Sequence, residues 1–184
     1  MITDEKKIKK VLQLLQDGYN KRDPKYLDTF MKIYSSKDSS LIIGTEQGGE
    51  FRGFESAKEL FLGDWKDWGD VKYDINTPDI QVNGDMAWVF MFAELEMSLS
   101  AKDLNKIALK MIKNTLENER ISENAKMVEI LRIGALNSVE KLKGEIFNCP
   151  LRVTVIFTKE NENWFINHMH FSHPVGLFNS FPRE

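Results

Sequence analysis

The stretch that decides the fold lies late in the chain and reads RVTVIFTKENENWFINHMHFS, residues 152–172. Apolar and polar side chains alternate on each side of its polar centre, a pattern typical of strands that bury one face. We therefore predict two strands, Leu151–Lys159 and Trp164–Ser172, joined by a turn at residues 160–163. This part of the chain thus carries a β-hairpin.

More strands are predicted upstream. From Asp70 to Val82 apolar residues again alternate with polar ones. Asn83-Gly84 is typical of a type I′ hairpin turn, because both residues tolerate a positive φ. Met86–Leu99 is predicted to be a long strand, apolar on both faces as far as Ala93 and therefore covered on both faces there.

The first part of the chain is predicted to be helical. Apolar residues recur at helical spacing over Ile8–Tyr19. A second helix is predicted to begin at Asp23-Pro24, since Asp can cap a helix and Pro fits its first turn. A third helix is predicted from Glu55 to Asp64. Helices followed by consecutive strands are the order of an α+β fold.

A helical segment interrupts the strands at residues 101–143. Its apolar residues fall on helix faces, Ser122 can cap its second helix, and Gly144 is placed to end that helix. A segment of about 43 residues is small for a core of its own. We therefore predict a helical hairpin inserted into the loop of a β-hairpin, within a single domain covering residues 1–184.

The composition fits an ordinary globular domain. Of the 184 residues, 42% are hydrophobic and 29% are charged, which argues against disorder. The net charge of −3 gives no sign of a nucleic-acid or acidic-membrane partner, and no apolar run approaches the roughly 20 residues of a membrane helix. The single cysteine, Cys149, excludes an internal disulfide. We expect a cytoplasmic protein with no nucleic-acid or membrane partner.

Four segments together resemble the SnoaL-like domains of the nuclear transport factor 2-like superfamily. They are the helix–turn–helix opening at Tyr19–Phe30, the glycine-led entry to the third helix at Glu50–Glu55, the start of the long strand at Asp85–Val89, and the closing hairpin. The closing hairpin also resembles the association domain of calcium/calmodulin-dependent kinase. Residues 101–143 lie outside these matches.

The resemblance implies a cone-shaped α+β barrel, in which a curved antiparallel sheet wraps around the N-terminal helices and leaves a pocket at the open end. It also implies a homodimer formed through the sheet. The inserted hairpin would cap the mouth of the cone or extend the dimer contact. The superfamily includes isomerases, dehydratases, cyclases, epoxide hydrolases and domains without catalysis, so an activity has to be argued from the site.

Two histidines and a tyrosine are candidates for acid–base chemistry. Regular strand alternation places His168 and His170 on one face together with Trp164 and Ile166. These histidines could line the cone wall as general bases, or they could be structural groups in the sheet or in a dimer interface. Tyr19 could reach the pocket as a phenolic donor, or it could complete the apolar face of its helix.

A further candidate is Asp38, which lies between the second helix and the first strand. Acid–base chemistry of the ketosteroid-isomerase or dehydratase kind needs a buried carboxylate or an Asp–His pair with a shifted pKa. The resemblance implies that Asp38 lies near the position where such enzymes often place an acid. Its neighbours in residues 35–40 are polar, so the alternative is a solvated loop.

A second set of residues is predicted to bind a ligand. Trp65, Trp68 and Trp88 suit a small apolar or ring-containing ligand, although core or dimer packing would use them equally well. Arg152 could clamp a carboxylate or pair with Glu94 or Glu96 on a neighbouring strand. The likeness to the kinase association domain implies that the pocket side of the last strand carries Asn167, Met169 and Phe171.

No metal and no cofactor are expected. His168 and His170 form a usable two-ligand arm, but strand 151–159 separates them from Glu94 and Glu96 by two strand spacings, about 9.5 Å. The chain has no Walker loop, dinucleotide glycine fingerprint or nucleophile elbow.

The sequence therefore indicates a small-molecule-binding SnoaL-like domain of undetermined activity. One alternative is a cofactor-free isomerase, dehydratase or cyclase that uses acid–base chemistry in the cone pocket. The other is an assembly or partner-binding domain without catalysis, whose pocket is filled by side chains.

Overall fold

The computed structural model describes residues 3–45, 49–98, 101–138, 141–143 and 146–174. The chain divides into two compact units, one formed by the residues up to Leu95 together with Pro150–His173, and one that includes Glu96–Cys149. None of the helices in the described ranges combines the length and the hydropathy that a membrane span requires.

The helices of the first unit are α1 (Asp4–Lys21), α2 (Leu27–Phe30) and α3 (Phe54–Asp67). The hydroxyl of Thr3 caps α1 by accepting a hydrogen bond from the backbone N–H of Lys6 at 3.4 Å. Buried side chains of α1 follow the predicted apolar stripe; they are Ile8, Leu12, Leu15 and Tyr19. The predicted first helix is confirmed.

The second predicted helix is divided into short pieces. A 3₁₀ turn at Pro24–Tyr26 precedes α2 and another at Met31–Ile33 follows it. Asp23 caps the first of these turns, since its carboxylate accepts a hydrogen bond from the backbone N–H of Lys25 at 2.9 Å. The cap is as predicted, but one continuous helix is not formed.

One sheet contains all the described strands. Across the sheet the order is β2 (Glu50–Arg52), β1 (Leu41–Ile43), β8 (Asn163–Ser172), β7 (Ile146–Glu160), β5 (Met86–Ser98) and β3 (Asp70–Tyr73), with β4 (Asp79–Asn83) paired to β5 and β6 (Lys141–Lys143) paired to β7. The β7–β8 and β4–β5 pairs are antiparallel, whereas β1 runs parallel to β8.

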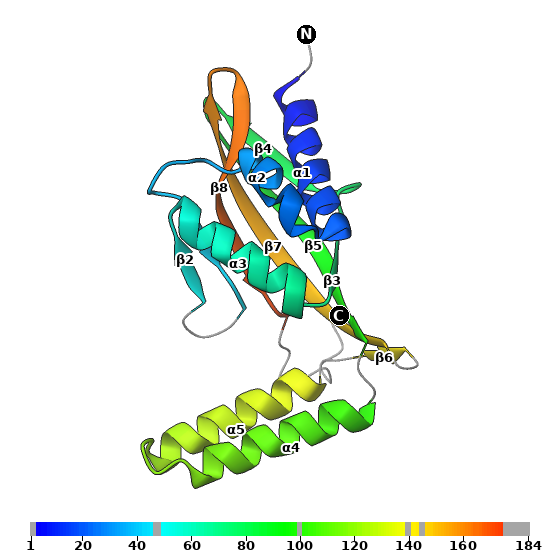
Figure 1. Ribbon diagram of the computed structural model, residues 1–184, viewed down its shortest axis with the longest axis vertical. Helices are drawn as coiled ribbons and strands as arrows, with labels where there is room; N and C mark the ends of the chain where they lie inside the picture. Colours follow the sequence, from blue (N-terminus) through cyan, green and yellow to red (C-terminus); the bar gives the residue numbers. More distant parts are fainter. Residues whose placement is uncertain (1–2, 46–48, 99–100, 139–140, 144–145, 175–184) are drawn as a thin grey trace, which may run out of the picture. The chain divides into compact units, whose positions relative to one another are not determined.

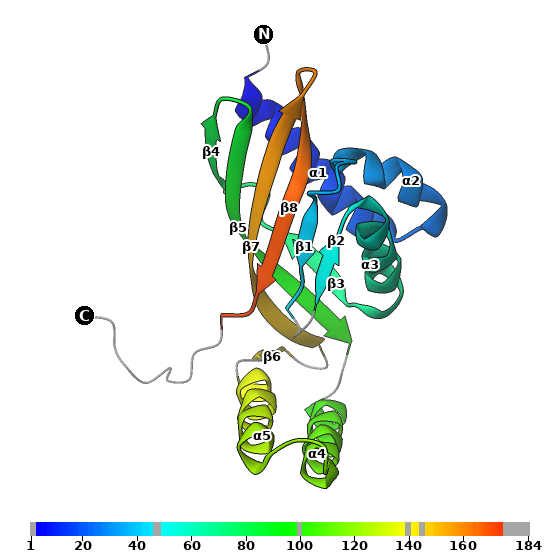
Figure 2. The same cartoon turned by 90° about the vertical axis from the view of Figure 1, so that its left-hand side faces the viewer.

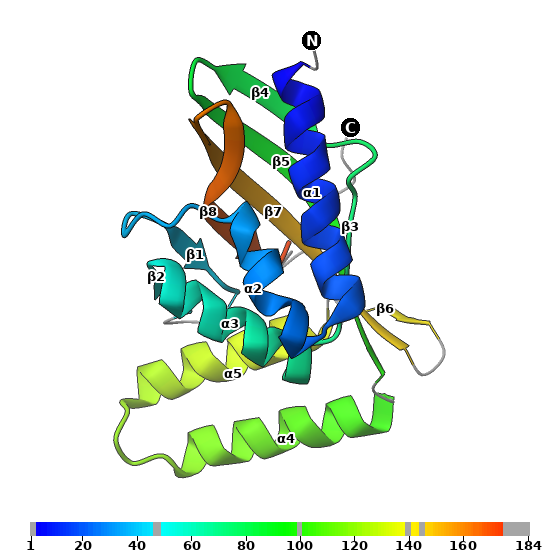
Figure 3. The ribbon, with the colours of Figure 1, turned by 45° about the horizontal axis from the view of Figure 1, so that its top comes forward.

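The helices of the first unit lie on one face of this sheet. Figures 1 and 3 show α1, α2 and α3 on the face around which the strands curve. Figure 2 shows β5, β7 and β8 from another side, with none of these three helices in front of them. The predicted α+β architecture, a curved sheet wrapped around N-terminal helices, is confirmed, and the parallel β1–β8 pair is an addition to it.

A β-bulge in β8 reverses the direction of its side chains. Ile156 of β7 pairs with His168 and Phe157 pairs with Ile166, so Asn167 has no partner on β7. Buried side chains accordingly lie at Trp164 and Ile166 before the bulge, and at Met169 and Phe171 after it.

The bulge corrects the predicted faces of β8. Regular alternation placed His168 and His170 on the same face as Ile166, and this prediction is wrong because one extra residue moves every later side chain to the opposite face. His168 is half-buried and His170 is exposed, on the face of β8 that points away from the core.

Aromatic rings fill much of the space between the helices and the sheet. Phe30 and Phe61 pack edge to face with ring centroids 5.0 Å apart, and Tyr19 contacts both rings edge-on. Gly18 of α1 is buried against the Phe30 ring, where even a Cβ atom would overlap the ring. The absence of a side chain at this position therefore sets the distance between α1 and α2.

The second unit contains the predicted helical hairpin. Its helices are α4 (Ala101–Glu117) and α5 (Glu123–Ser138), which pack against each other (Figure 1). Ser122 caps α5 as predicted, since its hydroxyl accepts a hydrogen bond from the backbone N–H of Ala125 at 3.2 Å. The helical pattern was predicted to continue to residue 143, but Lys141–Lys143 forms β6, and its predicted terminator Gly144 lies outside the described residues.

Replacing residues 101–143 with a short turn should leave a cooperatively folding protein, because the core of the first unit is formed without them. Circular dichroism during urea unfolding would measure this. We expect one transition with a smaller m-value than that of the full chain, since less surface is exposed on unfolding. Loss of any cooperative transition would contradict the interpretation of these residues as an insertion.

Candidate functional site

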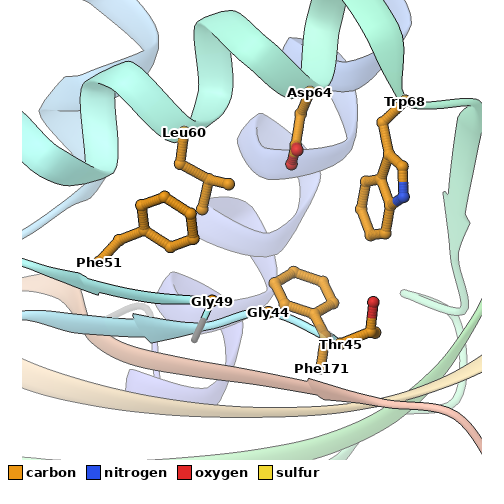
Figure 4. A pocket seen from close by; sticks show the side chains of 8 residues that line it. All are labelled: Gly44, Thr45, Gly49, Phe51, Leu60, Asp64, Trp68 and Phe171. Carbon is orange, nitrogen blue, oxygen red and sulfur yellow. The ribbon is translucent and has the colours of Figure 1, made fainter. Parts of the chain in front are cut away.

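A pocket of about 190 Å³ lies in the first unit between α3, the β1–β2 edge of the sheet and β8. The residues that line it are mostly apolar or aromatic: Gly44, Thr45, Gly49, Phe51, Leu60, Asp64, Trp68 and Phe171 (Figure 4). A dry cavity of about 150 Å³ can hold benzene. The volume is therefore suited to a ligand the size of a single ring.

Helix α3 and the residue that follows it position three of these side chains. Ala57, Phe61 and Trp65 recur every four residues and are buried in the core. On the adjacent face, Leu60 and Asp64 line the pocket, and Trp68 joins them from the extended position directly after the helix. One face of α3 thus holds the helix in place while the adjacent face presents a carboxylate to the pocket.

Asp64 is the one ionisable side chain among the residues that line the pocket. Figure 4 shows its carboxylate pointing from α3 into the space between Leu60, Trp68 and Phe171. The Tyr19 hydroxyl donates a hydrogen bond to Asp64 Oδ2 at 2.9 Å. Burial raises the pKa of Asp64 to about 6, although the Tyr19 hydrogen bond and the Arg22 charge act in the opposite direction. Asp64 can therefore change its charge close to neutral pH.

Three tyrosines surround this carboxylate on its core side. Burial raises the pKa values of Tyr19, Tyr34 and Tyr73 well above the ordinary range for a phenol, and the charge of Asp64 adds to the effect. These hydroxyl groups stay protonated at any physiological pH. They can donate hydrogen bonds, but only Asp64 can exchange a proton with a ligand here.

Arg22 fixes the segment that follows α3. Its guanidinium donates to the backbone carbonyls of Trp68, at 2.6 Å, and Gly69. It also forms an ion pair with Asp70 at 3.3 Å. These contacts hold Trp68 at the pocket wall and leave the Arg22 charge without an ion pair to Asp64.

Some of the predicted site residues come together at this pocket. Tyr19 reaches it through its hydrogen bond to Asp64, and Phe171 forms part of its wall. Met169 is buried on the same side of β8 and accepts a hydrogen bond from the Tyr34 hydroxyl at 3.1 Å. Trp65 is buried in the core beside Phe30, with ring centroids 5.1 Å apart, and does not line the pocket.

The other predicted residues lie elsewhere. Asp38 is exposed in a turn, and Asn167 occupies the bulge, where it donates to the Ser39 hydroxyl at 3.4 Å. The remaining five are on the face of the sheet away from the core; they are Trp88, Glu94, Arg152, His168 and His170. Burial and the nearby His170 lower the pKa of His168. In the described part of the chain, no three His, Cys, Asp or Glu side chains lie close enough to hold a metal ion.

Of the tryptophans considered from the sequence, Trp68 lines the pocket, whereas Asp64 and the small residues at the ends of β1 and β2 were not predicted. A signal for Asp64 was present, since it lies four residues after Leu60 and beside the buried Trp65 stripe of a predicted helix. A carboxylate at the border of an apolar stripe is either solvated or partly buried. The helical period alone does not distinguish these cases, because the distance to the sheet decides between them.

The outer face of the sheet carries a second feature. Trp88, Phe90 and Phe92 of β5 are 48%, 37% and 56% exposed, and the Phe90 and Phe92 ring centroids are 5.1 Å apart. Met86, which precedes them on the same face of β5, is 52% exposed. These four residues, called here the outer aromatic patch, form an apolar surface on a sheet face that the described helices of the first unit leave uncovered (Figure 2).

Comparison with known proteins identifies the family of this chain. The family model described as the SnoaL-like domain matches residues 11–121, which is more than half of the chain. The chain belongs to the SnoaL-like family. None of the curated proteins searched matches it.

Solved structures of low sequence identity share the fold. A nuclear transport factor 2-like superfamily protein from Salmonella enterica subsp. enterica serovar Typhimurium str. LT2 is 16% identical, with 97% of this chain and 96% of that chain covered and a TM-score of 0.59. A "putative dehydratase from the NTF2-like family" of Streptomyces avermitilis is 8% identical, with 94% and 97% covered and a TM-score of 0.60. An uncharacterized protein with a cystatin-like fold from Caulobacter vibrioides is 10% identical, with 90% and 86% covered and a TM-score of 0.53. Likeness at this level shows the fold and no activity.

Replacing Asp64 by Asn should raise the free energy of unfolding at pH 7 by about 1–2 kcal/mol. The pKa of Asp64 is about 6 in the folded chain against an ordinary value of 3.8. The folded state therefore binds the proton more tightly than the unfolded state does. As the pH rises from 3.8 to about 6, the cost of ionising the buried carboxyl group lowers the free energy of unfolding. The stability gained by the Asn variant stays small, because Asp64 is partly exposed and because its carboxylate accepts a hydrogen bond from Tyr19.

Urea unfolding at several pH values would measure this effect. The advantage of the Asn variant should shrink as the pH falls from 7 to 4. The exposed Glu59 of the same helix gives the control, since Glu59→Gln also removes a negative charge but buries nothing. An Asp64→Asn variant that is less stable than wild type at pH 7 would contradict the burial argument.

Proposed function

We propose that this chain binds a small, ring-sized molecule in the pocket under α3, with Asp64 as the polar anchor of that ligand. The observation that carries the proposal is the partly buried carboxylate, which faces an aromatic-lined space and forms no ion pair within the described part of the chain. Binding sites typically combine apolar walls with a few convergent polar groups and a perturbed pKa. The open volume also weighs against a cone filled by side chains.

Acid–base catalysis is the second candidate function. A carboxyl group with a pKa of about 6 can take up and release a proton near neutral pH, which an isomerase, dehydratase or cyclase without a cofactor requires. Tyr19 would orient that carboxyl group through its hydrogen bond. The predicted bases His168 and His170 lie on the outer face, so Asp64 replaces them as the proposed proton carrier.

A pair of Leu→Trp variants on α3 tests the binding proposal. Leu60 lines the pocket, whereas Leu62 is exposed on the same helix. Leu60→Trp should fill the pocket and weaken the binding of single-ring compounds such as phenol and cyclohexanone at least tenfold, while Leu62→Trp should bind as wild type does. Ligand-observed NMR would measure binding, and native mass spectrometry would detect a ligand that co-purifies. Equal binding by all three proteins would place the ligand elsewhere.

We also propose that two copies of the chain associate through the outer aromatic patch and that the protein is cytoplasmic. Adjacent exposed aromatic rings on a sheet face are typical of an interaction surface, and the single cysteine in the sequence suits a reducing compartment.

Analytical ultracentrifugation tests the association. Phe92→Lys should shift the protein toward monomer, because it places an ammonium group beside Phe90, where the most exposed ring of the patch was. Leu62→Lys adds the same charge on α3 and should leave the mass unchanged. A wild-type protein that is monomeric at high micromolar concentration would refute the proposed dimer.

A further inference from the structure

We infer that the ligand of this pocket is a small organic cation, an alkylammonium group held between the Asp64 carboxylate and the aromatic walls. The inference rests on the proposed binding function and adds to it the charge and the chemical class of the ligand.

The charge of the pocket is the first argument. Among the described residues that line it, Asp64 is ionisable and none is basic. Arg22 is the basic group whose charge acts on Asp64, and it is already held by two carbonyl groups and by Asp70. The pocket is therefore negative when Asp64 is ionised, which favours a cation and disfavours an anion.

The aromatic walls are the second argument. Trp68 and Phe171 meet almost at a right angle, with an interplanar angle of 89° and ring centroids 5.9 Å apart. Figure 4 shows these two rings and Phe51 arranged around the space into which the Asp64 carboxylate points. Ring faces attract cations through their quadrupole, and they contact the methyl or methylene groups of an ammonium ion. Aromatic faces around one carboxylate thus fit an ammonium ion better than a polar neutral molecule.

The size of the pocket limits the class further. A volume of about 190 Å³ accommodates a trimethylammonium group or a benzylamine, but it does not accommodate a polycyclic cation.

A neutral carbonyl ligand is the main alternative. Such a ligand would accept a hydrogen bond from the protonated carboxyl group of Asp64, so its affinity would rise at low pH. A cation needs the ionised carboxylate, so its affinity would fall at low pH. The direction of the pH dependence distinguishes the two classes.

Other groups around Asp64 do not change charge in the relevant range. Tyr19, Tyr34 and Tyr73 have raised pKa values and stay neutral, and Arg22 stays positive. On β8, the strand that carries Phe171, His168 and His170 point away from the core. A change in affinity between pH 5 and pH 7.5 therefore reports on Asp64.

Choline and its neutral isostere 3,3-dimethylbutan-1-ol provide a matched pair of probes, because they differ only in the charged atom. Isothermal titration calorimetry on the full chain at pH 7.5 should show choline binding at least tenfold more tightly. Asp64→Asn should abolish this difference, and the exposed control Glu59→Gln should retain it. Between pH 7.5 and pH 5 the affinity for choline should fall about tenfold, as Asp64 is protonated with a pKa of about 6.

The outcomes separate this inference from the proposed function. If the isostere binds as tightly as choline, or if phenol and cyclohexanone bind while choline does not, the inference fails and the pocket remains a binding site for neutral ligands. If none of these probes binds the wild-type protein, the inference and the proposed function fail together. Tighter choline binding at pH 5 than at pH 7.5 would also overturn the inference.

Discussion

One unpaired residue in β8, Asn167, determines which side chains face the helices. On one edge of β8 the partner changes at this position: Ile166 bridges to Tyr34, whereas His168 is the first residue to pair with β1. On the other edge β7 continues without interruption. The extra residue lets β8 satisfy both partners, and it turns Phe171 inward and the two histidines outward. A regular strand would bury imidazoles where the pocket now has an aromatic wall.

The chemistry of the pocket depends on which side chains of β8 face the helices. With Phe171 on the inner side, the surroundings of Asp64 are apolar and no basic group of β8 compensates its charge. Tyr19 supplies one hydrogen bond from α1, and the close approach of α1 to α2 at Gly18 holds the aromatic cluster around that tyrosine. The raised pKa of Asp64 is thus a property of the whole core and not of α3 alone.

The sequence indicated the elements better than it indicated the site. The apolar stripe of Ile8–Tyr19 and the alternation of β8 are local signals, and each produced the element that was predicted. The cap at Asp23 was also predicted, but it begins a 3₁₀ turn and not a continuous helix. The faces of β8 depend on pairing with residues more than a hundred positions away, so no local pattern could reveal the bulge. For that reason the predicted histidines do not line the pocket. The prediction that Met169 and Phe171 face the inner side of β8 came from the family resemblance and not from the strand pattern.

Packing alone does not account for an aspartate at position 64. An asparagine would have nearly the same shape and could also accept the hydrogen bond from Tyr19, without the penalty of placing a charge among aromatic rings. The carboxylate adds only two properties, a negative charge and an exchangeable proton near neutral pH. Neither property stabilises the fold, since the surrounding tyrosines stay neutral and Arg22 is bound to other groups. A molecule in the pocket is the partner on which either property could act, and a cation would offset the penalty that the fold leaves uncompensated.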